Sequence, residues 1–289
     1  MGPVTKSVRC GQFLLDLSSP VVMSILNITS DSFYAPSRTG NSNGELTDRA
    51  GQMLEEGAKI LDVGGMSSRP GAIEIDLQEE IDRVVSAIET LKASFPETII
   101  SVDTYRAEVA KQAIDAGATM VNDISGGSLD EGMIDVIASG KAAFVLMHMR
   151  GTPADMQSHT IYQDLIGDLV KYFVNKLRTF HERGIHDIII DPGFGFSKTI
   201  DQNFQIIRDL RTLRLLECPI LIGVSRKSSL SKVINRPVEE TLDATTALHI
   251  AALENGASML RVHDVKAAID AIAIFNKLHE AKNHSYNRL

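Results

Sequence analysis

Two aspartates and an asparagine stand where they could form hydrogen bonds to the edge of a flat heterocycle. Asp103 and Asp191 each follow a short apolar run directly, and Asn122 follows another. A carboxylate at the end of a buried strand is costly to desolvate unless it meets hydrogen-bond donors, and a ring with N–H and amino groups supplies donors in pairs. Lys227 could donate to a carbonyl oxygen or a ring nitrogen of the same molecule. The alternative is that either aspartate caps the helix that follows it.

The run 191–198 is the most specific local motif of the chain. It places two glycines and the aromatic residues Phe194 and Phe196 straight after Asp191. Glycine permits a positive φ and close backbone approach, and the two phenyl rings could wall an aromatic substrate. Lys198 ends the motif and adds a cation to the same loop. We expect this loop to line the binding site.

Two further segments gather cationic side chains suited to an anion. Residues 225–228 bring Ser225, Arg226 and Lys227 together, and residues 261–264 bring Arg261 and His263. Arg261 and His263 alternate in an extended segment, so we expect them to share one face. Both can donate to phosphate oxygens. The sequence therefore predicts a phosphate or diphosphate site at these two segments.

Asn27 ends the first apolar run and could bind a hard cation through its amide oxygen. Mg²⁺ commonly takes few protein ligands and keeps water and phosphate oxygens, so a pyrophosphate would strengthen this interpretation. Ser68 and Arg69 are natural donors to phosphate or carboxylate groups. We find no convincing pair of nucleophile and base, and His148 is equally compatible with a hydrogen-bonded core histidine. The site is therefore expected to bind and polarise a leaving group, without a covalent intermediate.

Parallel strands would bring these side chains together. Most of the polar groups named above follow one of eight short apolar runs, separated mostly by helix-like stretches, at residues 21–26, 60–63, 99–102, 120–121, 144–147, 188–190, 220–224 and 259–260. Eight buried parallel strands with helical crossovers close into a (β/α)₈ TIM barrel, whose chemistry sits at the carboxyl ends of the strands. The length of 289 residues suits one such α/β barrel, so we predict a single domain over 1–289.

Several segments outside the strands also carry expectations. Residues 1–20 are predicted to form a short β-hairpin that plugs the barrel floor, and residues 282–289 a frayed, disordered polar tail. An apolar stripe predicts a long helix over about 161–183. The loops 28–45 and 64–76 are predicted to act as flaps over the site, with 149–160 as a third loop.

Composition narrows the class of protein. The net charge of −8 argues against general nucleic-acid binding through a basic face. No segment reaches the roughly 18 apolar residues that a membrane span needs. The two cysteines, Cys10 and Cys218, form no metal-binding spacing, and a reduced, cytoplasmic setting is the simpler expectation.

Over essentially its full length the chain resembles the dihydropteroate synthase family of folate biosynthesis. The order and spacing of the matching stretches are specific, although single pieces are not; the stretches lie at residues 25–29, 31–33, 62–65, 67–71, 101–104, 122–124, 147–149, 191–198, 225–228 and 261–264. The resemblance implies an enzyme that joins 4-aminobenzoate to a dihydropterin methyl diphosphate and releases pyrophosphate. It also implies Mg²⁺ as cofactor and a homodimer formed through helices late in the barrel.

The resemblance further implies a role for each matching residue. The pterin would be bound by Asp103, Asn122, Asp191 and Lys227, with Met147 along its wall and Arg261 against its face. The diphosphate would be held by Ser68, Arg261 and His263, with Asn27 helping to hold Mg²⁺. The aminobenzoate would be surrounded by Phe33, Arg69, Phe196 and Ser225. Asp103, Lys227, Arg261 and His263 are the predicted catalytic residues.

The chain departs from the family pattern at four positions. Many members have an acidic residue at Met66, Thr at Ser68, Pro at Ser30 and Gly at Ser197. Two other functions stay open at this point. A methyltetrahydrofolate methyltransferase acting with a corrinoid protein would explain the Asp and Asn residues, but it has no need of Arg261, His263 and Lys198 around a diphosphate. A paralogue that binds pterin without turnover would be marked by Met66.

Overall fold

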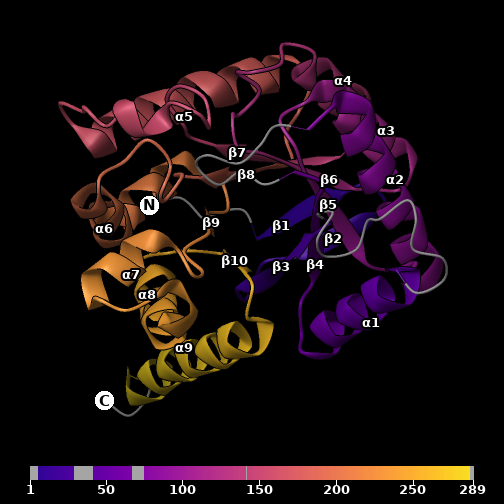
Figure 1. Cartoon of the computed structure of the whole chain (residues 1–289). Coiled ribbons are helices and arrows are strands. Elements are labelled where there is room, and N and C mark those ends of the chain that lie inside the picture. The colour runs from indigo at the N-terminus through magenta and orange to yellow at the C-terminus, as the bar shows by residue number, and fades with distance from the viewer. Residues whose placement is uncertain (1–5, 29–41, 67–74, 141, 287–289) are drawn as a thin grey trace.

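The computed structural model describes residues 6–28, 42–66, 75–140 and 142–286, and it confirms the predicted α/β barrel (Figure 1). Eight parallel strands form one sheet in the order β8-β7-β6-β5-β4-β3-β10-β9. A bridge between Ile190 and Ile220 links β8 to the start of β9 and closes the ring. The barrel strands are β3 (Val21–Asn27), β4 (Ile60–Gly64), β5 (Ile99–Asp103), β6 (Met120–Asp123), β7 (Ala143–Met147), β8 (Ile188–Asp191), β9 (Leu221–Ile222) and β10 (Met259–Val262).

Helices surround the strands on the outside of the ring (Figure 1). In the described part of the chain they are α1 (Ser42–Glu55), α2 (Leu77–Ser94), α3 (Ala107–Asp115), α4 (Met133–Gly140), α5 (Leu165–Glu182), α6 (Ile200–Asp209), α7 (Ser228–Ile234), α8 (Leu242–Glu254) and α9 (Val265–Tyr286). Short 3₁₀ turns lie at Met156–Ser158, Leu210–Leu216 and Val238–Glu240. None of the described helices combines the length and the apolar character needed to cross a membrane.

The barrel strands are buried because both of their faces are covered. One apolar cluster lies between the strands and the surrounding helices, where Phe144 of β7 stacks against Phe180 of α5 with ring centroids 5.0 Å apart. This two-sided burial explains why the strands read in sequence as continuous apolar runs rather than as alternating patterns. The polar residues that follow most of these runs lie at the last or next-to-last position of their strand or just beyond it, as predicted.

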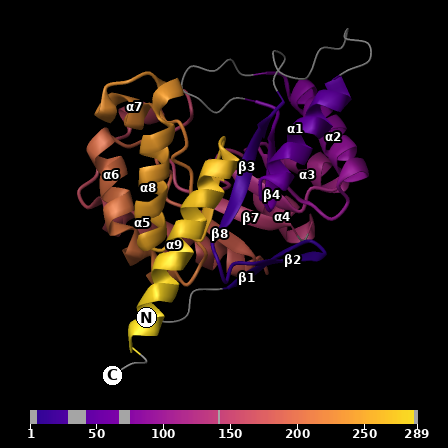
Figure 2. The same cartoon turned by 90° about the horizontal axis from the view of Figure 1, so that it is seen from below.

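The amino-terminal hairpin covers the floor of the barrel, as predicted. Strands β1 (Ser7–Cys10) and β2 (Phe13–Asp16) pair antiparallel, with Ser7 opposite Asp16. They lie at one end of the ring (Figure 2). Their buried side chains Val8, Cys10 and Leu15 form a second apolar cluster with the first residues of the barrel strands. The hairpin thus closes the barrel at the end opposite to the carboxyl ends of the strands.

Two helix boundaries differ from the sequence prediction. Helix α5 begins at Leu165 rather than near 161, because Asp164 caps it by accepting a hydrogen bond from the backbone N–H of Gly167. Helix α9 continues to Tyr286, so most of the predicted tail at 282–289 is helical. No glycine or proline follows Gly256 that would end this helix earlier. Residues 287–289 lie outside the described part of the chain.

Candidate active site

Neighbouring strands place three predicted site residues, Asn27, Asp103 and Asn122, in one row with Gly64. The sheet register sets Asn27 of β3 beside Gly64 of β4, Gly64 beside Asp103 of β5, and Asp103 beside Asn122 of β6. A Cβ at Gly64 would lie 3.5 Å from Oδ1 of Asn27 and 3.6 Å from Cβ of Asp103. Asn27 and Asp103 therefore flank the same end of β4.

Arg261 lies on β10, the neighbour of β3 on the side away from β4, and its guanidinium contacts this group. Its Nε donates to Oδ2 of Asp62 at 2.6 Å, and its Nη2 donates to Oδ2 of Asp103 at 2.5 Å. Nδ2 of Asn122 donates to the same Asp62 oxygen at 3.1 Å. One guanidinium, two carboxylates and one carboxamide thus form a single buried cluster, hereafter the Asp62 cluster.

Burial and charge set the protonation of this cluster. Burial raises the pKa of Asp103 to about 7, although the neighbouring Arg261 cation opposes the shift. Burial alone would lower the pKa of Arg261, but Asp62 and Asp103 outweigh it, and the net shift is upward. Arg261 is therefore always a cation, whereas Asp103 changes charge near neutral pH.

A second group lies around the end of β8. Asp191 is buried, and its Oδ1 accepts a hydrogen bond from the backbone N–H of Gly193 at 2.7 Å. Lys227 donates to the carbonyl oxygen of Phe194, and its Nζ lies 4.6 Å from the ring centroid of Phe196. Burial lowers the pKa of Lys227 to about 8, against the opposing effect of Asp191. Lys227 is therefore a cation that can lose its proton at mildly alkaline pH.

The backbone conformation of the loop 191–198 requires the glycines that its sequence contains. Gly193 has φ +73°, and a Cβ there would lie 2.1 Å from the carbonyl oxygen of His148. Ser197 has φ +48°, a conformation that glycine accepts more easily. The Ser197 hydroxyl accepts a hydrogen bond from the backbone N–H of Arg150 at 3.0 Å. That bond holds the serine in its positive-φ conformation.

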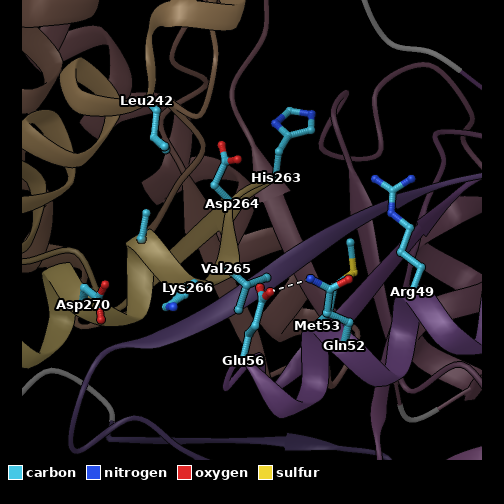
Figure 3. Close-up of a pocket in the computed structure, with 11 residues that line it drawn as sticks. Arg49, Gln52, Met53, Glu56, Leu242, His263, Asp264, Val265, Lys266 and Asp270 are labelled. Atoms are coloured by element: carbon cyan, nitrogen blue, oxygen red, sulfur yellow. Dashed lines mark hydrogen bonds between the residues drawn. The ribbon is translucent and has the colours of Figure 1, made fainter.

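The walls of the site include the predicted apolar and aromatic residues. Met147 and Phe196 belong to a small cluster at the carboxyl ends of the strands, together with Ile124, Met149, Met156 and Tyr105. On β10's side, the backbone N–H of His263 donates to Oγ of Ser225 at 3.1 Å, and its Nδ1 lies 3.2 Å from the same oxygen. His263 also borders a cavity of about 420 Å³ between α1 and the start of α9 (Figure 3).

Two cations grouped with the predicted anion site have other partners. Nζ of Lys198 is buried and donates to the carbonyl oxygen of Phe196 at 2.9 Å, with Nδ1 of His148 at 3.1 Å. Arg226 donates from Nε and Nη2 to the carboxylate of Asp264, at 2.7 Å for both bonds. Both cations are therefore engaged by groups of the protein itself. His148 is a buried, hydrogen-bonded histidine, which is the second of its two predicted roles.

Three predicted site residues, Phe33, Ser68 and Arg69, lie outside the described residues, as do both flap segments over most of their length. The role of Asp62, in contrast, was not predicted. This residue lies in the matching stretch 62–65, but the sequence alone assigned it no role. A signal was present, because Asp62 interrupts an apolar run that forms a fully buried strand. A carboxylate at such a position requires partners.

The chain is similar to known pterin-binding proteins in sequence and in fold. A family model described as pterin binding enzyme matches residues 23–263. A dihydropteroate synthase from Synechocystis sp. is 42% identical over 261 residues, covering 89% of this chain and 90% of that protein. Two solved structures of dihydropteroate synthases are also similar. The Xanthomonas albilineans enzyme with 4-aminobenzoic acid has a TM-score of 0.87 and 35% identity, covering 95% of this chain and 98% of that one. The Burkholderia cenocepacia enzyme with 7,8-dihydropteroate has a TM-score of 0.85 and 34% identity, covering 98% and 100%.

Proposed function

Because the chain belongs to the family of pterin-binding enzymes, we infer that it is a transferase that acts as a dihydropteroate synthase. It condenses (7,8-dihydropterin-6-yl)methyl diphosphate with 4-aminobenzoate. The bond between the methylene carbon and the diphosphate oxygen breaks, and a bond to the aniline nitrogen forms. The products are 7,8-dihydropteroate, pyrophosphate and the proton lost by the aniline.

For the pterin we propose the two groups of polar side chains at the carboxyl ends of the strands. Asp103 and Asp191 accept from the N–H and amino groups at the edge of the ring, and Asn122 can both donate and accept there. Lys227 donates to the carbonyl oxygen or a ring nitrogen. Lys227 would exchange its bond to the Phe194 carbonyl for this contact. Arg261 lies against the ring face and Met147 along its wall. The observation that carries this proposal is the convergence of Asp103, Asn122 and Arg261 on one another within the Asp62 cluster.

The remaining roles concern the leaving group and the second substrate. Arg261 and His263 stabilise the negative charge that develops on the departing diphosphate, with Ser68 as a further donor. Asp103, when ionised, stabilises the cationic methylene left on the pterin. Phe33, Arg69, Phe196 and Ser225 surround the aminobenzoate, whose aniline nitrogen captures the cation. A strong general base is not required for that capture.

Asn27 would contribute to a Mg²⁺ site that needs the substrate. The described residues contain no group of three or more His, Cys, Asp or Glu side chains that could hold a metal ion. Oδ1 of Asn27 and the carboxylate of Asp103 both lie within 4 Å of the Cβ position of Gly64, and a single amide oxygen suits a cation with few protein ligands. When bound, Mg²⁺ would neutralise charge on the diphosphate.

We also propose a homodimer in the cytoplasm. The late helices carry exposed apolar side chains that a partner could cover, namely Val233 on α7 and Ile274 and Leu278 on α9. The described cysteines Cys10 and Cys218 are both free thiols, which suits a reducing compartment.

Pyrophosphate release tests the proposed activity. The purified protein is incubated with Mg²⁺ and the pterin diphosphate, with and without 4-aminobenzoate, and pyrophosphate and dihydropteroate are measured. We expect both products to require both substrates. A protein that binds the pterin without releasing pyrophosphate would be a non-catalytic paralogue. One that binds methyltetrahydrofolate and is silent in this assay would be a corrinoid-dependent methyltransferase.

A further inference from the structure

Asp62 is a carboxylate in the middle of a buried barrel strand. It belongs to β4, every residue of which is buried, and its own relative exposure is 0%. Its Oδ2 accepts two hydrogen bonds, from Nε of Arg261 and from Nδ2 of Asn122. Its Oδ1 is also buried and has no hydrogen-bond partner among the described residues.

Stability does not account for a carboxylate at this position. A buried ion pair gains little over apolar residues of the same volume, because both charges lose their hydration. A buried oxygen without a partner adds a further cost. The partners of Asp62 point instead to the site, since the proposed function assigns Asn122 to the edge of the pterin and Arg261 to its face and to the diphosphate.

The contact with Arg261 fixes the plane of a guanidinium. Asp62 holds Nε and Asp103 holds Nη2, so the group is attached at two points and cannot rotate about its long axis. Nη1 makes no hydrogen bond within the described part of the chain and remains available to a ligand. A planar, two-point attachment of this kind is what arginine offers and lysine does not.

The contact with Asn122 fixes the direction of a carboxamide. The amide can turn over and exchange its oxygen for its NH₂ group, unless a neighbour accepts only one of them. An ionised Asp62 accepts and cannot donate, so it requires the NH₂ group on its own side. The Asn122 oxygen is thereby turned away from Asp62.

We propose that Asp62 is the positioning residue of the pterin site: one of its carboxylate oxygens sets the plane of Arg261 and the orientation of the Asn122 amide. The inference rests on the proposed function for its choice of ligand. Asp62 itself acts through its two partners and not on the reacting atoms.

The variant Asp62→Asn tests the proposal, because it keeps the shape but introduces a group that can donate. Affinity for the pterin diphosphate is measured by calorimetry without aminobenzoate, and kcat and KM are measured for both substrates. We expect pterin affinity and kcat/KM to fall by about 100-fold, as for a displaced catalytic group. KM for 4-aminobenzoate should stay unchanged, because Asp62 contacts only groups assigned to the pterin.

Asp130→Asn is the matched control. Asp130 accepts from the backbone N–H groups of Ala107 and Gly132 at 2.8 and 3.0 Å, so its loss weakens the fold without touching the site. This variant should melt earlier and keep the pterin affinity of the wild type. If Asp62→Asn also lowers only the melting temperature, the positioning role is refuted.

A double-variant cycle separates positioning from a general effect on the fold. In an Asn122→Ala background, Asp62→Asn should lower pterin affinity clearly less than it does alone. The reason is that the contact with Asn122, one of the two contacts through which Asp62 acts, is already absent. Additive losses would overturn the proposal. A wild-type protein that binds pterin but lacks turnover would refute the proposed activity and still leave the affinity cycle informative.

A measurement on the wild-type protein covers the case in which Asp62→Asn does not fold. The Nε proton of Arg261, observed by NMR, should exchange with solvent far more slowly than that of Arg208. The Arg208 side chain is 71% exposed, whereas Arg261 is held by the buried Asp62. Equal exchange rates would contradict the fixed guanidinium on which the proposal depends.

Discussion

The guanidinium of Arg261 on β10 donates to the carboxylate of Asp103 on β5 at 2.5 Å, although 158 positions separate the two residues. The strand order places β3 and β4 between them, so the ion pair reaches across the carboxyl ends of four strands. Such a pair ties the strands whose side chains are proposed to bind the pterin to the strand whose side chains are proposed to bind the diphosphate. The proposed substrate has the same layout, with a planar ring joined to an anionic tail.

The variant Asp103→Asn should weaken pterin binding. It removes a charged acceptor from a buried site, and hydrogen bonds to charged groups contribute roughly 1.5–3 kcal/mol, which corresponds to about 10- to 100-fold in affinity. Calorimetric titration with the pterin diphosphate measures this. Asp187→Asn serves as control, since Asp187 bonds to the N-terminal hairpin through the backbone N–H of Arg9. Near-normal pterin affinity in Asp103→Asn would count against the assignment.

The variant Arg261→Ala should abolish turnover. It removes the cation assigned to the diphosphate and leaves Asp62 and Asp103 buried without their partner, at a cost of about 3–5 kcal/mol in stability. Pyrophosphate release is measured at a temperature where circular dichroism shows the variant folded. Arg208→Ala, which breaks an exposed pair with Asp209, should keep full activity. A folded Arg261→Ala protein with substantial activity would refute the role.

The rate should pass through a maximum between about pH 7 and about pH 8. Burial raises the pKa of Asp103 to about 7, so its required ionised form is lost as the pH falls below that value. Burial lowers the pKa of Lys227 to about 8, so its required cationic form is lost as the pH rises above that value. The product of the two fractions gives a bell-shaped profile of kcat/KM. A profile that stays flat from about pH 6 to about pH 9 would show that neither group titrates in the free enzyme.

The barrel and most of the polar groups at its mouth could be predicted from the sequence, because each strand is an apolar run with its functional residue at or just beyond the end. The partners of the cations could not be predicted. Lys198 and Arg226 stand in the expected loops, but the fold turns Lys198 to the Phe196 carbonyl and Arg226 to Asp264. Those contacts depend on the path of a loop in three dimensions, which residue spacing does not record.

The role of Asp62 and the start of α5 were not predicted correctly, and the reasons differ. Asp62 lies within its strand rather than at its end, so a search of strand ends passed over it. The apolar spacing before α5 continues into Ile161 and Tyr162, but the Tyr162 hydroxyl donates to the carbonyl oxygen of Ser197 at 3.1 Å. That long-range bond outweighs the local helical pattern.

The variant Gly193→Ala should damage the loop 191–198. The residue has φ +73°, and the new Cβ would lie 2.1 Å from the carbonyl oxygen of His148, so the backbone must move. We expect a loss of roughly 1–3 kcal/mol in the free energy of unfolding, together with weaker pterin binding. Gly44→Ala in α1 is the control, because its Cβ would meet no atom within 4 Å. Denaturant unfolding that shows equal stability for both variants would contradict the observed loop geometry.

Removal of Mg²⁺ should stop turnover without releasing a metal from the free protein. A single amide oxygen, that of Asn27, is too little to hold the ion alone, so binding should depend on the diphosphate. Chelation should therefore abolish pyrophosphate release, and added Mg²⁺ should restore it. Asn27→Ala should raise the Mg²⁺ concentration needed for half-maximal rate. Full activity in chelator, or tight Mg²⁺ binding without substrate, would refute this site.

The central claim is that side chains from distant strands form one pocket for a pterin, and a crystal structure with bound 7,8-dihydropteroate tests it most directly. The pterin edge is predicted to contact Asp103, Asn122, Asp191 and Lys227, with the Arg261 guanidinium against its face. A pterin ring bound elsewhere, with the Asp62 cluster unchanged and out of contact, would contradict the claim.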